Sequence, residues 1–338
     1  MGMKRFVKAL AALAVLAVVL AGCGTAKLGS GFKFGTGDKG GKYYLYGTKF
    51  AQVISSENKK LTFKIKKTAG SAANLRLLGD GFLDVAIVQS DMLSDALQGT
   101  GMFEKTGPKT GFAPLAGLYT EVCQIVVSDA SEIRSVYDLA GKRISLGNKE
   151  TGGMQNALQI LAAHGLDEEM VEPVHLSFTR SVAALERGEI EAFFCTAGTP
   201  TKAIADLGKK IPIRLLAIPP EVMQYMMMMY SGYTPCSIPA GTYPGQTEDI
   251  STLGVKAVLV ASTSVSDADV EEMTKFLFIH GDKLADAVGL PNELDPEYAT
   301  SDIPGGFHAG AANYYKTLGM EVPIYEGPEA KRPNAKQD

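Results

Sequence analysis

The sequence has few of the residues, and none of the motifs, that common catalytic and metal sites require. Among its 338 residues are four histidines and four cysteines, and they form no H-E-x-x-H, no G-x-S-x-G and no paired Cys/His spacing. The cysteines Cys123, Cys195 and Cys236 fit no zinc pattern and are expected to be buried free thiols. We therefore expect a protein that is not an enzyme and uses no metal and no cofactor.

Basic stripes and long apolar runs are also missing. The formal net charge is −4, and no stripe of basic residues interleaved with aromatics occurs, which excludes a nucleic-acid binder. Beyond the first 22 residues, no apolar run approaches the roughly 20 residues that a membrane-spanning helix needs. The densest apolar patch, Met226 to Met229, is predicted to lie on a core-facing or lobe-interface helix.

The N-terminus has the pattern of a bacterial export signal. Lys4, Arg5 and Lys8 precede an uncharged apolar run at 9–21, which is too short to span a bilayer. The sequence L-A-G-C that ends at Cys23 resembles a lipobox, in which the cysteine is lipidated and becomes the first residue. An ordinary signal peptide with an incidental cysteine is the alternative. Two or three acyl chains at Cys23 would anchor the protein stably to a membrane.

Cleavage of this signal peptide would change the size and charge of the chain. Removal of residues 1–22 leaves 316 residues and takes away three positive charges, so the formal net charge falls from −4 to −7. Residues 23–30 would then form a flexible tether. We expect an extracytoplasmic lipoprotein, in the periplasm or at the cell surface, with enough residues for two lobes.

From residue 31 onward, short apolar runs typical of strands alternate with helical patterns, which indicates an α/β fold. An extended stretch at 115–127 could bridge two lobes. We predict a first lobe at 31–120, a second at 121–240, and a return to the first lobe with C-terminal helices at 241–338. The predicted strands are 32–37, 61–67, 85–90, 142–147, 174–178, 190–195, 213–218 and 255–260, and the predicted helices are 43–57, 71–78, 153–164, 180–187 and 267–285.

A repeated pattern supports the two-lobed organisation. The sequences L-G-D-G-F-L-D-V at 78–85 and L-E-R-G-E-I-E-A at 185–192 both end a predicted helix just before an apolar strand. We expect Gly81 and Gly188 to follow their helices in the left-handed conformation. Asp84 and Glu191 would then mark the entrance of each strand.

Polar and small residues follow several of the predicted strands. In open α/β sheets, ligands bind beyond the carboxyl ends of the strands, where helix N-termini offer unpaired N–H groups to an anion. Such loops in both halves predict a cleft that closes around a small polar ligand. The five loops are Thr36–Tyr44, Ala69–Asn74, Gln89–Asp91, Asn148–Gly153 and Thr196–Thr201.

The first of these loops allows an alternative function. Gly35, Gly37 and Gly40 form G-x-G-x-x-G, the pattern of a dinucleotide-binding turn, and Glu57 lies near the place of a ribose-binding acid. A nucleotide-binding enzyme is therefore one hypothesis. Glycines that serve only a tight turn from strand to helix are the other, and they agree better with an exported protein, which meets little NAD.

Five segments resemble the solute-binding proteins of the TAXI group of TRAP transporters, over roughly residues 34–319. The resemblance implies a two-lobed periplasmic-binding-protein fold of type II, with the ligand cleft between the lobes. It also implies capture of a small organic acid, glutamate-like or another dicarboxylate, by lobe closure, and its delivery to a TRAP membrane permease driven by an ion gradient. The segments are G-T-G-D-K-G-G-K-Y-Y (35–44), A-G-S-A-A-N-L-R-L-L (69–78), V-Q-S-D (88–91), F-F-C-T-A-G-T-P-T (193–201) and I-P-A-G-T-Y-P-G-Q (238–246).

The same resemblance implies a set of ligand-binding residues. This chain departs from the family's usual Y-Y-P at Leu45, and from its usual G-S-G-T-E in the segment K-E-T-G-G-M-Q at 149–155, so its ligand can differ from the commonest one. Lys39, Lys42 and Lys149 are either partners for a second carboxylate or solvated loop lysines. The implied ligand-binding residues are Thr36, Gly37, Tyr43, Tyr44, Ser71, Asn74, Gln89, Ser90, Thr151, Gly152, Ala197, Gly198, Thr199 and Pro200.

The sequence leaves the downstream partner open. A lipoprotein of the same fold can hand a signal, rather than a solute, to its membrane partner, and the residues do not distinguish the two roles. We expect a monomer that contacts its ligand, a permease and, through its lipid, the membrane.

Overall fold

The computed structural model describes residues 31–39 and 41–327 of the chain. Contacts divide the chain into Met1–Gly31 and Phe32–Asp338, and the fold belongs to the second unit. The predicted signal peptide, the lipidation at Cys23, the tether and Gly40 lie outside the described residues. Within the described ranges, no helix is both long and apolar enough to cross a membrane.

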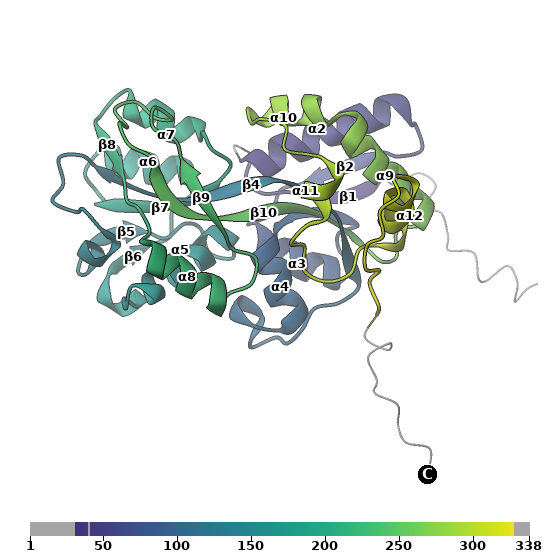
Figure 1. The fold of residues 1–338 in the computed structure, drawn as a ribbon, viewed down its shortest axis with the longest axis horizontal. Helices are drawn as coiled ribbons and strands as arrows, with labels where there is room; N and C mark the ends of the chain where they lie inside the picture. Colours follow the sequence, from purple (N-terminus) through teal and green to yellow (C-terminus); the bar gives the residue numbers. More distant parts are fainter. Residues whose placement is uncertain (1–30, 40, 328–338) are drawn as a thin grey trace, which may run out of the picture. The chain divides into compact units, whose positions relative to one another are not determined.

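One sheet runs through the described unit (Figure 1). Its strands are β1 (Phe32–Gly35), β2 (Phe63–Lys66), β3 (Val85–Gln89), β4 (Phe112–Ser128), β5 (Arg143–Ser145), β6 (Glu172–Val174), β7 (Ala192–Ala197), β8 (Ile213–Leu215), β9 (Thr234–Ile238) and β10 (Ile250–Ser262). The order is β2-β1-β3-β10-β4-β7-β5-β6, with β8 beside β4 and β9 beside β10. The groups β1–β3 and β5–β7 are each parallel, which is the product of strand–helix–strand connections.

Two long antiparallel strands, β4 and β10, join the two parallel groups. The last part of β10 pairs with β3, while its first part pairs with β9 up to Gly254. The last part of β4 pairs with β7 and β8. Both strands therefore cross between the groups near Glu121 and Val255, which face each other in the ladder. We call the part built on β1–β3 lobe 1 and the part built on β5–β9 lobe 2.

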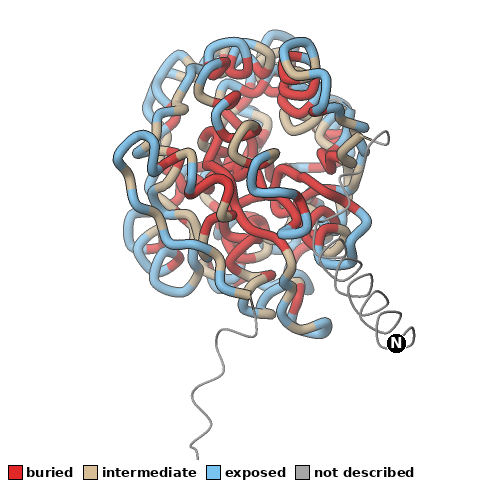
Figure 2. Tube along the Cα trace, turned by 90° about the vertical axis from the view of Figure 1, so that its right-hand side faces the viewer, coloured by how far each residue is buried: buried red, intermediate tan, exposed pale blue. Residues whose placement is uncertain are grey.

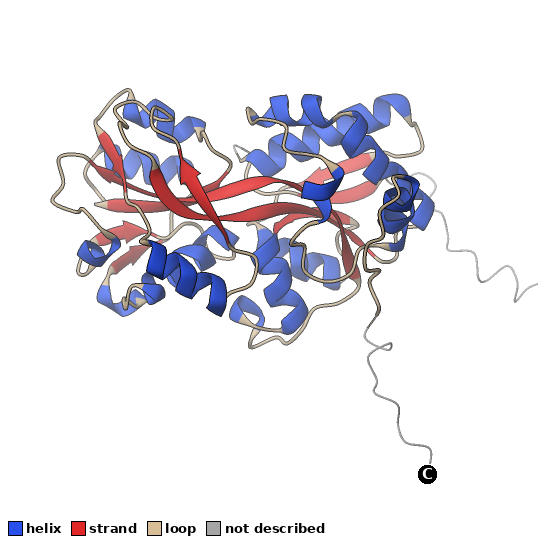
Figure 3. Cartoon of the chain, viewed as in Figure 1, coloured by secondary structure: helices blue, strands red, loops and turns tan. Residues whose placement is uncertain are grey.

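Helices cover both faces of the sheet in each lobe (Figure 3). Successive strand residues alternate between the faces: Ile87 packs with α2 and α9, and Val88 with α3 and α4. In lobe 2, Ile125 packs with α5, and Val126 with α6 and α7. Buried residues accordingly follow the strands, and exposed ones lie on the outer helices and loops (Figure 2). The α-helices are α2 (Lys42–Glu57), α3 (Ser71–Gly79), α4 (Ser90–Gln98), α5 (Gly152–Ala163), α6 (Phe178–Glu186), α7 (Lys202–Gly208), α8 (Pro220–Met229), α9 (Asp267–Ile279), α10 (Gly281–Val288), α11 (Pro296–Thr300) and α12 (Ala309–Thr317), and the short 3₁₀ helices are η1 (Gly101–Phe103), η2 (Val136–Leu139) and η3 (Glu168–Met170).

The repeated pattern forms two equivalent turns. Gly81 and Gly188 follow α3 and α6 with φ of +74° and +69°, as predicted. The acidic residue of each copy then exchanges two hydrogen bonds with the neighbouring parallel strand. Lys33 N donates to Asp84 Oδ2 at 2.8 Å, and Asp84 N donates to Lys33 O at 3.0 Å. Glu191 makes the same pair of bonds to β5.

Most predicted elements lie within a few residues of the observed ones, and the extended stretch at 115–127 is part of β4. The strand predicted at 174–178 is wrong, because β6 ends at Val174 and the chain turns into α6 at Ser177. The helix predicted at 267–285 is interrupted at His280. The methionine patch is only partly core-facing: α8 buries Met226, whereas Met228 is 78% exposed.

The predicted domain limits at 120 and 240 stay predictions. The first falls beside the crossing in β4. In the structure β10 still pairs with β9 up to Gly254, so the crossing back into lobe 1 lies beyond residue 240.

We predict that Asp84→Ala destabilises the protein more than Glu191→Ala, although the two residues are equivalent in the repeat. Asp84 is buried, so its loss leaves the Lys33 N–H without that partner beside the core, at a cost of roughly 1–3 kcal/mol. Glu191 is exposed, and its loss should cost no more than about 0.5 kcal/mol. Urea unfolding followed by circular dichroism measures both. Equal losses would contradict this explanation.

Candidate functional site

A cavity of about 780 Å³ lies between the two lobes. It forms where the carboxyl ends of the parallel strands in the two lobes face each other, the usual location of ligand sites in open α/β sheets. Of the six helices that follow these strands, all but α4 start at the cavity wall. The first residues of α2, α3, α5 and α6, namely Lys42, Ser71, Gly152 and Phe178, all line it.

These helix N-termini favour an anion. The residues before α2, α3 and α6 make no side-chain hydrogen bond to the first turn, whereas Thr151 Oγ1 accepts one from Met154 N at 3.1 Å. An α-helix carries a positive partial charge of about half a unit at its N-terminus. None of the described residues that line the cavity is an arginine. Backbone N–H groups, hydroxyls and the lysines of the lining, rather than an arginine, are therefore the groups available to hold an anion here.

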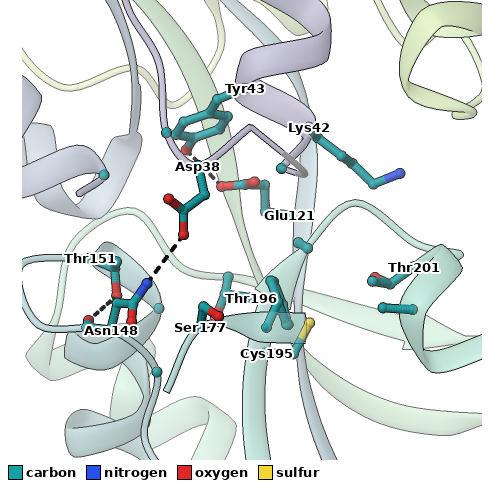
Figure 4. A pocket seen from close by; sticks show the side chains of 18 of the residues that line it. Asp38, Lys42, Tyr43, Glu121, Asn148, Thr151, Ser177, Cys195, Thr196 and Thr201 are labelled. Carbon is teal, nitrogen blue, oxygen red and sulfur yellow. Dashed lines mark hydrogen bonds between the residues drawn. The ribbon is translucent and has the colours of Figure 1, made fainter. Parts of the chain in front are cut away.

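Glu121 adds a buried carboxyl group to the wall. It lies where β4 crosses between the lobes, is 5% exposed, and accepts a hydrogen bond on Oε2 from the Tyr43 hydroxyl at 2.8 Å (Figure 4). Burial raises the pKa of Glu121 to about 7, although hydrogen bonds from Tyr43 and Gln89 and the charge of Lys42 oppose the rise. Near neutral pH this carboxyl can therefore be a hydrogen-bond donor or an acceptor.

Three further charged residues of lobe 1 line the cavity, Asp38, Lys39 and Lys42. Lys42 Nζ donates to Val288 O at 2.8 Å and to Pro200 O at 3.5 Å, and burial lowers the pKa of Lys42. Asp38 points across the cavity and accepts a hydrogen bond from Asn148 Nδ2 of lobe 2 at 3.3 Å (Figure 4). Asp38 thus links the first loop of lobe 1 to the loop before α5.

The lobes also touch directly beside the cavity. Arg76 of α3 and Glu150 of the loop before α5 form an ion pair at 2.6 Å. The start of α5 packs so closely on β3 that a Cβ atom added to Gly152 would lie 1.4 Å from Gln89 Oε1. A larger residue at 152 would therefore have to displace the Gln89 side chain of lobe 1.

More than half of the predicted ligand-binding residues line the cavity, and they come from both lobes. Their contact with a ligand stays a prediction. The lining members are Gly37, Tyr43, Ser71, Gln89, Thr151, Gly152, Ala197 and Pro200.

The other predicted residues support the wall or lie beside it. Asn74 Nδ2 donates to Thr36 O at 2.8 Å and to Ile87 O at 2.9 Å, which ties the ends of β1 and β3 together. Gly198 packs against lobe 1, where an added Cβ atom would lie 2.5 Å from the Leu290 side chain. The predicted residues that do not line the cavity are Thr36, Tyr44, Asn74, Ser90, Gly198 and Thr199.

Several lining residues were not predicted from the sequence. Glu121 could have been recognised from the sequence, because it is a charged residue inside the otherwise apolar stretch at 115–127. Of the three lysines considered as cations, Lys39 and Lys42 line the cavity, whereas Lys149 is exposed and does not. The polar lining residues that the sequence did not single out are Asp38, Asn148, Thr196 and Thr201, which lie within the predicted loops, and Glu121, Ser177, Thr179, Ser181 and Lys202, which lie outside them.

The glycines of the first loop have steric roles. A Cβ atom at Gly35 would lie 2.4 Å from Leu83, so this position must be small. Gly37 faces open space at the cavity wall. Glu57 is at the far end of the 16-residue helix α2, where its Oε1 lies 3.1 Å from His280 Nε2. It is therefore not placed to bind a ribose held by the loop.

Metal-binding and redox groups do not gather at this site. Within the described residues, no cluster of three His, Cys, Asp or Glu side chains could hold a metal ion. Cys123, Cys195 and Cys236 are free thiols, and the first two are buried.

We predict that Glu121→Gln reduces the dependence of stability on pH. The pKa of Glu121 rises from its ordinary 4.5 to about 7 on folding, so its protonated form favours the fold. Its contribution is full below about pH 4.5 and is lost as the pH rises through about 7, which amounts to about 3 kcal/mol. The glutamine keeps an acceptor for Tyr43 but does not titrate.

Urea unfolding at pH 5 and pH 8 measures this difference. The loss of unfolding free energy between the two values should be about 2.5 kcal/mol smaller in the variant. Burial also raises the pKa of Asp91 to about 7, so Asp91→Asn is a matched comparison that leaves Glu121 in place. If Glu121→Gln shows the same pH dependence as the parent, then the Glu121 carboxyl ionises as readily in the folded protein as in the unfolded chain, which contradicts the explanation.

The family and the solved structures that resemble this chain are consistent with the observed fold. The model of the NMT1-like family matches residues 34–319. A Bordetella bronchiseptica RB50 protein of known structure is similar at 17% identity, over 89% of this chain and 92% of that one, with a TM-score of 0.51. A Xanthomonas citri protein solved with a chloride ion is similar at 12% identity, over 85% and 98%, with a TM-score of 0.50.

A further similarity is to the periplasmic aliphatic sulphonate binding protein SsuA from Escherichia coli, at 14% identity over 91% of this chain and 94% of that one, with a TM-score of 0.45. At such identities, similarity concerns the fold alone. The predicted α/β fold of type II periplasmic binding proteins, with two lobes joined by crossing strands, is confirmed.

Proposed function

The chain belongs to the NMT1-like family, and from this premise we propose that it is an extracytoplasmic, lipid-anchored solute-binding protein that captures a small organic acid between its lobes. The convergence of helix N-termini from both lobes on one cavity is the observation that carries the proposal. A carboxylate there would meet N–H groups of α3 on one side and of α5 on the other. Binding would thus hold the lobes together.

The proposed transport partner is a TRAP permease, and the proposed group is TAXI. Four segments that carry the resemblance contribute to the cavity wall, at 35–44, 69–78, 88–91 and 193–201. They supply, among others, Tyr43, Ser71 and Ala197. The resemblance implies glutamate-like or other dicarboxylate ligands within the wider class of organic acids. The position of Glu57 speaks against the nucleotide-binding alternative.

We predict that an organic acid stabilises the purified protein without residues 1–22. A ligand at a hundred times its Kd adds about 2.7 kcal/mol, which should raise the Tm by several degrees. Differential scanning fluorimetry over a panel of mono- and dicarboxylates, followed by calorimetry on each positive compound, measures the effect. A flat response across the whole panel would contradict the proposed function.

The variant Gly37→Phe locates the binding site. Gly37 lines the cavity and a Cβ atom there meets nothing within 4 Å, so we expect a phenylalanine at this position to occupy cavity space. Ligand stabilisation should disappear while the unliganded Tm stays within a few degrees. Gly327→Phe is the matched control, since position 327 is equally unobstructed and does not line the cavity. Retained binding in Gly37→Phe would place the ligand elsewhere.

A further inference from the structure

The cavity has two ends of different chemistry. The first end, where α3 and α5 begin, holds polar side chains that include Asp38, Tyr43 and Asn148, and Figure 4 shows Lys42 and Thr201 on the opposite side. The second end lies between the start of α2 and the end of α10 in lobe 1, and α6 and α7 in lobe 2. Glu121 stands between the two ends (Figure 4).

Apolar side chains form much of the second end. Leu176, Phe178, Cys195 and Ala205 line the cavity and also belong to one hydrophobic cluster of lobe 2. Lobe 1 contributes Val288 and the side chain of Leu45, which is 42% exposed although it is apolar. Burial of a solvent-exposed leucine side chain under an apolar part of a ligand contributes favourably to the free energy of binding.

The cations at the second end are already engaged. Lys42 Nζ donates to the carbonyl oxygen of Val288 at 2.8 Å, and burial lowers its pKa. Lys202 forms an ion pair with Asp206, four residues further along α7. Lys202 thus has a carboxylate partner, and Lys42 is held by backbone carbonyl oxygens.

The cavity is also large for a short dicarboxylate. A five-carbon dicarboxylic acid has about ten non-hydrogen atoms, and at no more than the volume share of one water each they would fill about 300 Å³. The cavity measures about 780 Å³. More than half of the cavity would stay filled with water.

We propose that the second end binds an apolar substituent, so that the ligand is a monocarboxylate with an extended aliphatic or aromatic tail. This inference rests on the proposed function, because it assigns the carboxylate of the ligand to the helix N-termini at the first end. The tail passes Glu121 and covers Leu45, Phe178 and Ala205. A dicarboxylate of the same length buries a charge against these side chains and binds more weakly.

The purified full-length protein tests this with a matched series of acids by calorimetry. From butanoate to octanoate, affinity should rise about four-fold for each added methylene group. Glutarate should bind more weakly than pentanoate, and octanedioate at least ten-fold more weakly than octanoate. Ala205→Phe should remove the gain from pentanoate to octanoate and leave the affinity for butanoate within two-fold. Ala162→Phe, on an exposed position of α5, should change neither.

A second variant guards against misfolding of the first. Leu45 is exposed, so Leu45→Glu disrupts no core, and its charge should weaken octanoate at least ten-fold while glutarate changes less than two-fold. If glutarate is the tightest ligand and both variants bind as the parent does, the inference is wrong and the proposed function stands. If no acid of either kind binds, the proposed function itself is contradicted.

Discussion

The arrangement of the whole unit depends on the pairing of β4 with β10. Both strands continue from lobe 1 into lobe 2 and stay hydrogen-bonded to each other through the crossing, where Glu121 faces Val255. Because β10 also pairs with β3 and β4 also pairs with β7, this shared ladder fixes the position of one parallel group relative to the other. The carboxyl ends of β1–β3 and β5–β7 consequently point toward one space, and the helices that follow begin there. The cavity is thus a consequence of strand topology rather than of any single loop.

The crossing also creates the main electrostatic conflict of the site. Several helix N-termini favour a negative charge in the cavity, yet the wall contains a carboxyl group of its own. The raised pKa of Glu121 reduces the conflict, since its protonated form does not repel an anion and can donate a hydrogen bond to it, whereas Asp38 is a second carboxyl group in the wall. Tyr43, which is hydrogen-bonded to Glu121, connects this group to the first turn of α2.

The sequence predicted those features that depend on neighbouring residues. The apolar run of β4 and the left-handed glycines at 81 and 188 are local, and both are confirmed. The side-chain roles at the cavity depend on residues far apart in the chain. Asn74 does not line the cavity, because its amide nitrogen donates hydrogen bonds to backbone carbonyl oxygens at the ends of β1 and β3. No sequence pattern near residue 74 indicates these bonds.

Glu121 illustrates the same limit from the other side. The sequence shows a charged residue within an apolar strand. Its position in the cavity wall depends on the hydrogen bond from Tyr43 and on the strand crossing, and only the fold brings these together. Likewise, the run of methionines predicted an apolar helix face, whereas the packing of α8 decides that Met226 is buried and Met228 is not.

A crystal structure of the protein with its tightest organic-acid ligand tests the central claim most directly. We predict that the carboxylate of the ligand lies between the first turns of α3 and α5 and accepts hydrogen bonds from their backbone N–H groups at about 2.7–3.1 Å. A ligand found outside the cavity, or one whose carboxylate is held only by lysine side chains at the opposite end, would contradict it.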